Sequence, residues 1–189
     1  MSTNNQLEVD ALFGGLEPSE HPYLWFVVHT KPRWEKKFAH YCKLHNINYY
    51  LPLIDSVRVY HERKVIFKKP LFPGYIFLKC QKEDKSLLFR SGSIVRFISV
   101  PAEAELLDDL ENIYRSLSAD QPIKNHSFVK EGYKVKITGG SFVDVEGVVI
   151  DADNPNEVIV GIHIIQQAIC VKVDPAHIEL ISRTVQELD

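Results

Sequence analysis

The sequence predicts an α+β protein in which an N-terminal antiparallel sheet flanked by helices is followed by a small C-terminal β-barrel. Between residues 23 and 117, short apolar runs alternate with segments of helical periodicity, which indicates one sheet with helices packed on it. Residues 118–128 are polar and aperiodic, as in an interdomain linker. Residues 129–182 carry short β-branched runs separated by Gly, Asn and Pro, the pattern of a small barrel.

The N-terminal part begins with an acidic segment and a strand. Residues 1–22 are polar and aperiodic, and we predict a disordered leader. They contain no Lys or Arg, so we expect no secretory signal. Residues 25–29 are apolar and β-branched and predict a buried strand. A helix is predicted over 33–45, because one apolar stripe collects Trp34, Phe38, Tyr41, Cys42 and His45.

The middle of the chain is organised around a stiff turn at residues 70–77. Proline fixes φ and lacks an N–H, so Pro70 and Pro73 exclude helix and central-strand pairing. Gly74 permits a sharp turn before a strand that begins at Tyr75. Phe72, Tyr75 and Phe77 form a cluster of rings that either packs in the core or makes an apolar socket for a partner.

The remaining elements follow from the same periodicities. Around the turn, we predict strands at 49–54, 57–60, 64–67 and 94–100, a short helix at 82–89 and a longer helix from 101 to 117. In the C-terminal part, we predict strands at 133–137, 145–150, 158–162, 168–173 and 178–181. The many β-branched residues in these last runs favour a stable barrel over a helical alternative.

The charges are unevenly distributed along the chain. Residues 31–96 hold 15 Lys and Arg against 5 Asp and Glu, a net charge of +10. Residues 1–30 carry −4 and residues 97–189 carry −9, so the whole chain is at −3. The asymmetry indicates that the first half lies near nucleic acid, while solvated faces of two ordinary domains are the alternative.

The sequence lacks the common signatures of catalysis. It contains no phosphate-binding loop, no dinucleotide fingerprint and no nucleophile elbow. Its eight histidines are scattered, and its three cysteines are widely spaced, as in a reducing cytoplasm. No apolar run approaches the ~20 residues of a membrane span. We therefore expect a cytoplasmic protein that is not an enzyme, without catalytic residues, cofactor or metal site.

Five short motifs stand out in the first part of the chain: Trp25-Phe26-Val27-Val28, Lys31-Pro32-Arg33-Trp34-Glu35-Lys36-Lys37, Tyr50-Leu51-Pro52, Pro70-Leu71-Phe72-Pro73-Gly74-Tyr75-Ile76-Phe77 and Ser93-Ile94-Val95-Arg96-Phe97. Three follow in the second part: Glu131-Gly132-Tyr133-Lys134-Val135-Lys136-Ile137, Gly139-Gly140-Ser141-Phe142 and Glu146-Gly147-Val148-Val149. The first set resembles the N-terminal domain of the NusG transcription factors, and the second resembles their C-terminal KOW barrel. The resemblance implies an N-terminal (NGN) domain at 23–117 and an SH3-like KOW domain at 129–182. The basic helix start and the acidic leader suggest a specialised paralogue of the UpxY or RfaH kind.

The resemblance also implies a function. In this family the first domain binds the clamp helices of the largest RNA polymerase subunit and suppresses pausing and termination. Carried over by position, the polymerase-binding residues are His29, Phe72, Pro73, Tyr75, Phe77 and Phe97. Operon-specific relatives also contact non-template or upstream DNA, which maps onto Lys31, Arg33, Lys37, Tyr41 and Arg90.

The same resemblance supplies further partners. The KOW barrel of relatives recruits the termination factor Rho or a ribosomal small-subunit protein, and we expect a monomer that is drawn to the nucleoid through polymerase. The alternative is a free-standing RNA-binding or ribosome-associated protein of the KOW type. That alternative predicts salt-sensitive binding to folded RNA, and the net charge of −9 in the half that contains the barrel disfavours it.

Overall fold

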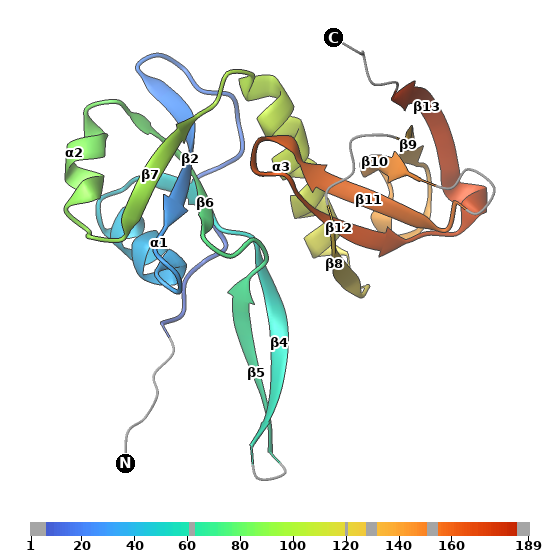
Figure 1. Cartoon of the computed structure of the whole chain (residues 1–189), viewed down its shortest axis with the longest axis horizontal. Helices are drawn as coiled ribbons and strands as arrows, with labels where there is room; N and C mark the ends of the chain where they lie inside the picture. Colours follow the sequence, from blue (N-terminus) through green and yellow to red (C-terminus); the bar gives the residue numbers. More distant parts are fainter. Residues whose placement is uncertain (1–6, 61–62, 120, 128–131, 151–154, 185–189) are drawn as a thin grey trace. The chain divides into compact units, whose positions relative to one another are not determined.

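The structure is a computed structural model that describes residues 7–60, 63–119, 121–127, 132–150 and 155–184 (Figure 1). The chain divides into two compact units, residues 1–103 and 104–189. Both units are rich in antiparallel strands, the first also carries helices on its sheet, and the α+β class is confirmed. No helix in the described ranges is long and apolar enough to cross a membrane.

The first unit is built on a five-stranded antiparallel sheet in the order β1-β3-β6-β2-β7. Its strands are β1 (Leu12–Phe13), β2 (Tyr23–Thr30), β3 (Asn48–Tyr50), β6 (Tyr75–Gln81) and β7 (Ile94–Ser99). Helices α1 (Glu35–Leu44) and α2 (Asp84–Phe89) complete the unit. The predicted strands at 25–29 and 94–100 and the two predicted helices are thus confirmed, with ends shifted by a few residues.

The core of this unit lies between one face of the sheet and α1. Side chains alternate along a strand, so Phe26 and Val28 of β2 lie on the same face as Ile76 and Leu78 of β6. They form one buried cluster with Phe38, Ala39 and Cys42 of α1 and Leu88 of α2. This packing positions the N-terminal end of α1 beside the end of β2, where the candidate site is found.

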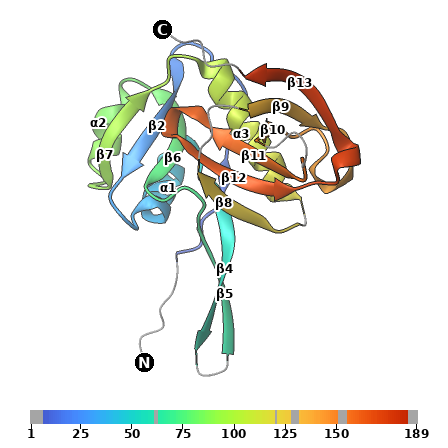
Figure 2. The same ribbon diagram turned by 45° about the vertical axis from the view of Figure 1, so that its right-hand side comes forward.

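Strands β4 (Leu53–Tyr60) and β5 (Arg63–Pro70) form a separate two-stranded antiparallel hairpin that projects from the sheet (Figures 1 and 2). The sequence predicts one strand over residues 49–54. In the structure the chain leaves the sheet after Tyr50 and starts the hairpin at Leu53. Pro52 separates the two strands, and its carbonyl accepts a hydrogen bond from the Leu71 N–H at 2.8 Å.

The described part of the acidic leader differs from the predicted disordered segment. Strand β1 pairs with β3, and the Leu51 N–H donates to the Ala11 carbonyl at 2.7 Å. The Trp25 indole N–H donates to the Glu17 carbonyl at 3.2 Å. A two-residue strand gives no periodic signal, and the pairing of β1 depends on β3, a partner far along the chain.

The second unit contains helix α3 (Glu103–Ser118, from Ala104 onward) and a six-stranded antiparallel sheet in the order β13-β9-β10-β11-β12-β8. The strands are β8 (Ile123–Ser127), β9 (Gly132–Ile137), β10 (Glu146–Val149), β11 (Glu157–Ile162), β12 (Gln167–Lys172) and β13 (Ile178–Thr184). Short 3-10 turns occupy Gly140–Phe142, His163–Ile165 and Pro175–His177. All five predicted strands are present. The polar segment interpreted as a linker supplies the sixth, because β8 pairs with β12.

Helix α3 groups with the second unit, although sequence reasoning ends the first domain at residue 117. Three polar contacts tie it to β10, to the residue Asp144 before that strand and to the 3-10 turn that begins at His163. Asp109 accepts a hydrogen bond from the His163 N–H at 2.8 Å, and Asn112 accepts one from the Glu146 N–H at 2.8 Å. The Arg115 guanidinium donates to the Asp144 carbonyl at 3.1 Å. Periodicity shows that a helix buries one face, but it does not show which element covers it.

We expect the contact between His163 and Asp109 to make the stability of the second unit depend on pH. The His163 Nδ1 lies 3.0 Å from the Asp109 carboxylate, and this hydrogen bond raises the pKa of His163 above its ordinary 6.5. A raised folded-state pKa contributes stability that is complete below the unfolded pKa and is lost as pH rises through the folded pKa. We therefore expect the stability advantage of the wild type over Asp109→Asn to be larger at pH 6 than at pH 8.

An NMR titration of the His163 imidazole checks this directly. Its pKa should lie above 6.5 in the wild type and should fall in Asp109→Asn. Glu105 also raises the pKa, from 3.8 Å, but burial lowers it by more, so no elevation should remain in that variant. A His163 that titrates identically in the two proteins would contradict the assigned cause.

Candidate functional site

Hydrogen bonds to α1, to β2 and within the turn itself fix the conformation of the turn between β5 and β6. Gly74 has φ of +84°, a left-handed conformation that favours glycine. Its N–H donates to the buried Glu35 carboxylate at 2.7 Å, and its carbonyl accepts from the Thr30 N–H at 2.8 Å. The Tyr75 N–H closes the turn on the Phe72 carbonyl at 3.2 Å. The turn is therefore fixed to both the end of β2 and the start of α1.

Two stacked rings lie next to this turn. His29 and Tyr75 are directly paired across β2 and β6, their ring centroids are 5.2 Å apart, and their planes differ by 25°. A Cβ at position 74 would lie 3.3 Å from the His29 ring, so glycine also lets the ring approach the backbone. Both rings are half-buried and Pro73 beside them is exposed. A pre-formed, partly accessible aromatic pair loses little entropy on binding a partner.

The six predicted polymerase-binding residues do not form one surface in this structure. Phe72 and Phe77 are 2% and 0% exposed, so they support the turn and the sheet from inside. Phe97 pairs with Val28, whose side chain points to the face opposite His29. It packs edge-on against Phe26 and Phe89, with centroids at 5.8 and 5.4 Å. On the face that carries His29, the accessible members of the set are His29, Pro73 and Tyr75, whereas Phe97 is half-buried on the opposite face.

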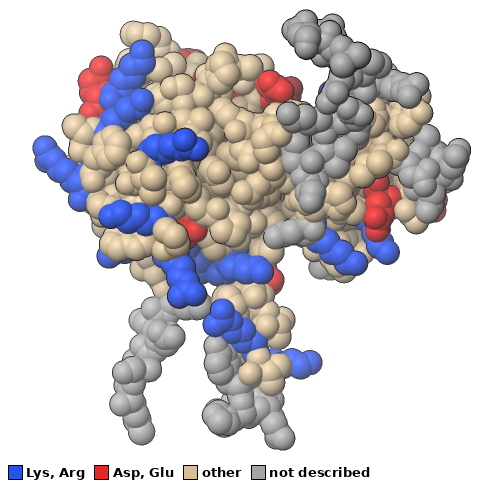
Figure 3. Space-filling view, viewed as in Figure 1, with Lys and Arg blue, Asp and Glu red and all other residues tan. Residues whose placement is uncertain are grey.

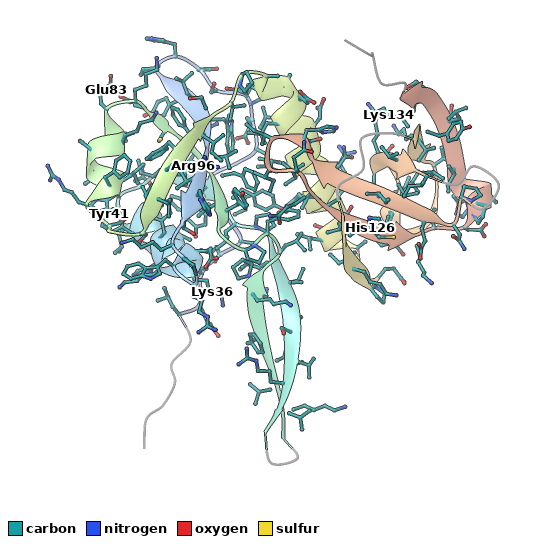
Figure 4. All side chains as sticks on the ribbon, viewed as in Figure 1. Lys36, Tyr41, Glu83, Arg96, His126 and Lys134 are labelled. Atoms are coloured by element: carbon teal, nitrogen blue, oxygen red, sulfur yellow. The ribbon has the colours of Figure 1, made fainter. Side chains whose placement is uncertain are left out.

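Arg96, and not the predicted Phe97, lies on the same face of the sheet as His29. It pairs with His29 across β2 and β7, so the two side chains share a face, and it is exposed (Figure 4). The only signal in the sequence is its place directly before Phe97 in an alternating strand. Recognising it requires the register between β2 and β7, which no local pattern gives.

The predicted DNA-binding residues divide between two places. Lys31 and Lys37 both lie over the Trp34 ring, with Nζ atoms 5.6 and 4.2 Å from its centroid. Tyr41 bridges α1 to α2 by donating to the Leu87 carbonyl at 3.1 Å, and Arg90 is exposed just after α2. These four residues form the basic edge of the first unit. Figure 3 shows Lys and Arg side chains spread over the visible face of this unit and along the hairpin.

Arg33, the fifth predicted residue, lies elsewhere. It lines a cavity with Glu35 and Lys36, on the hairpin side of α1. Its φ of +66° is uncommon for a residue with a side chain, and such backbone strain clusters at functional sites. The basic edge and this cavity are therefore separate features of the first unit.

The cysteines lie in the interior. Cys42, Cys80 and Cys170 are all buried, and burial raises the pKa of each thiol, to about 12 for Cys80. A thiol held protonated is a poor nucleophile and a poor metal ligand. The described residues include no group of three or more His, Cys, Asp or Glu that could hold a metal ion.

The family model and the curated relatives that this chain matches carry the same family name. Residues 23–113 match the family model described as "Transcription termination factor nusG". The match starts at β2 and includes every predicted polymerase- and DNA-binding residue. It also includes most of α3, which groups with the second unit.

Curated relatives extend the similarity over more of the chain. A transcription termination/antitermination protein NusG from Rickettsia typhi is 26% identical over 143 residues, which cover 68% of this chain and 74% of the relative. The protein of the same name from Borreliella burgdorferi is 23% identical over 180 residues, covering 83% and 98%. A solved structure described as "Domain interaction in Thermotoga maritima NusG" aligns with 85% of this chain and 98% of its own, at a TM-score of 0.44 and 22% identity. The family model and the curated relatives agree, and residues 23–113 of this chain form a NusG-family domain.

Proposed function

We propose that this protein is a transcription elongation and antitermination factor that binds the clamp helices of the largest RNA polymerase subunit through its first unit. The observation that carries the proposal is the stacked pair of His29 and Tyr75 beside exposed Pro73, on a turn fixed by Gly74 and Glu35. An amphipathic helix needs an apolar, pre-formed surface of this kind. Arg96 adds a cation at the margin of the surface.

The basic edge supports a second contact in the same complex. Lys31, Lys37 and Arg90 are exposed, and phosphate recognition needs clustered cations. We propose that this edge contacts non-template or upstream DNA while the aromatic pair engages polymerase. The contact suppresses pausing and termination without any catalytic step. The basic helix start and the acidic segment before β2 favour a specialised, operon-specific member of the family.

The second unit is proposed to recruit another protein, such as Rho or a ribosomal small-subunit protein. Its strands carry exposed apolar side chains, including Leu180 and Ile181 on β13, which is a sheet edge. The protein would act as a monomer in the cytoplasm, at the nucleoid.

Binding to purified RNA polymerase core enzyme tests the proposal most directly. We expect the full chain to co-migrate with polymerase in size-exclusion chromatography and to shorten pauses in a single-round transcription assay. A competing fragment that contains only the clamp helices should displace it. A folded chain that neither binds polymerase nor changes pausing would exclude this function.

A further inference from the structure

A cavity of about 1010 Å³ lies in the first unit between the leader, helix α1 and the hairpin. Leader residues 8–10 supply one wall, α1 supplies the second, and strands β4 and β5 supply the third. Its volume is at the upper end of the range of pockets that hold small ligands. None of its lining residues belongs to the predicted polymerase-binding or DNA-binding sets. The cavity is therefore a feature that the proposed function does not use.

Lys36 differs from Lys43, the other lysine that α1 contributes to this cavity. The Lys43 ammonium donates to the Asp10 carboxylate in an ion pair. Lys36 is half-buried (it is labelled in Figure 4), and within the described ranges it makes no ion pair or hydrogen bond. An ammonium in this position has lost part of its hydration without gaining a partner that compensates for it.

The surroundings of Lys36 favour the neutral amine. Desolvation has the largest effect and lowers the pKa of Lys36, the Glu8 carboxylate raises it, and the charge of Lys68 lowers it again. The pKa therefore lies below its ordinary 10.5, and more of the amine is neutral at neutral pH. A lysine amine that is desolvated, or that lies next to another cation, is activated as a nucleophile in this way.

Other charged and polar groups approach Lys36 from both sides. In the cavity, α1 adds His40, one helical turn after Lys36 and on the same face of the helix. The hairpin adds Lys68, which is paired across β4 and β5 with Asp55. On the other side of Lys36, a second cavity brings three more charged residues: Arg33, Glu35 and Lys69. Lys68 and His40 therefore offer N–H donors, from two elements, to an anion that approaches the Lys36 amine.

We propose that Lys36 is an acylation site whose co-substrate is an acyl phosphate. The phosphate group binds the N–H donors of Lys68 and His40, and the acyl chain lies against the apolar side chains of Leu44 and Ile66 in the same cavity. The neutral amine attacks the carbonyl carbon, a C–N bond forms, and the C–O bond to the phosphate breaks. The proton of the amine leaves with the phosphate as hydrogen phosphate, and the product is an amide without positive charge. The inference goes beyond the proposed function and does not depend on polymerase binding.

Acetyl phosphate tests the proposal on the folded full chain at neutral pH. Mass spectrometry that resolves individual lysines gives the rate of acetylation at each position. We expect Lys36 to react about fivefold or more faster than Lys82, which is exposed and lies outside the cavity. The difference should vanish in urea, where the chain is unfolded. Equal rates in the folded chain, or a preference that persists in urea, would overturn the inference.

Two substitutions should change the rate at Lys36 in opposite directions. Lys68→Gln removes a phosphate donor and a repelling charge, and should slow the reaction about threefold or more. Glu8→Gln removes the carboxylate that raises the pKa of Lys36, and should accelerate it. The matched control is Lys64→Gln, which removes an exposed lysine of β5 outside the cavity and should leave the rate unchanged. If Lys64→Gln slows the reaction as much as Lys68→Gln, the effect reflects the overall charge of the hairpin, and the site is excluded.

An uncharged acetyl thioester separates phosphate binding from amine reactivity. It carries the same acyl group but offers no phosphate to Lys68 and His40. The preference for Lys36 over Lys82 should therefore be smaller with the thioester than with acetyl phosphate. An equal preference with the two reagents would contradict an acyl phosphate as the co-substrate. No arm of the experiment contains polymerase, so a failure of the proposed function would leave these results unaffected.

Discussion

Replacing Tyr75 with alanine is expected to weaken binding to RNA polymerase about 30-fold or more. Tyr75 is half-buried, stacks on His29 and sits directly after the fixed turn, so its ring is already in place before binding. Buried aromatic anchors at interfaces typically contribute ~2 kcal/mol or more, which corresponds to this factor. Titration of labelled protein with polymerase core enzyme measures the loss.

Tyr23→Ala is the matched control. Tyr23 begins β2, in the same sheet, and is 45% exposed, but it lies at the end of that strand far from His29. Its removal should leave polymerase binding within about twofold of the wild type, because isolated surface side chains contribute little. His29→Phe should also bind well, since it preserves an aromatic partner for Tyr75. Normal affinity in a folded Tyr75→Ala protein would remove the aromatic pair from the interface.

The regular elements of this protein were predictable because their side chains repeat with a fixed period. The apolar stripe that contains Phe38 and Cys42 is sufficient to predict α1, and β-branched runs are sufficient to predict the strands of the second unit. Strands β1 and β8 were not predicted. Each depends on pairing with a partner far along the chain, β3 and β12 respectively, and neither has an internal pattern that reveals it.

The sequence predicted which residues contribute to the candidate site, but it did not predict how they are arranged in space. Local sequence places Tyr75 and Phe77 on one face of a strand, as observed. It cannot show that Phe77 is covered, or that Phe97 and His29 lie on opposite faces, because both depend on how β6, β2 and β7 align. The sequence also cannot show that the Thr30 hydroxyl lacks a hydrogen-bond partner among the described residues, since its environment is made by α1, β5 and the turn before β6.

Phe77→Ala is expected to destabilise the first unit by about 3–5 kcal/mol, the range for removing a large buried ring. Phe77 lies on the central strand β6 between Val27 of β2 and Tyr50 of β3, and it is fully buried. Its truncation removes apolar burial and leaves a cavity in a close-packed sheet. This residue therefore acts through stability, in contrast to Tyr75.

Tryptophan fluorescence can measure this loss in the full chain. The protein has two tryptophans, Trp25 and Trp34, and both lie in the first unit, so urea unfolding followed by their emission reports on that unit alone. Phe89→Ala removes a ring that is 50% exposed and should shift the unfolding midpoint only slightly. A Phe77→Ala protein with a wild-type midpoint and weakened polymerase binding would mean that the Phe77 ring becomes accessible to polymerase. In that case burial in the free chain would not identify the binding surface, and the narrowing of the predicted set to His29, Pro73 and Tyr75 would have to be reversed.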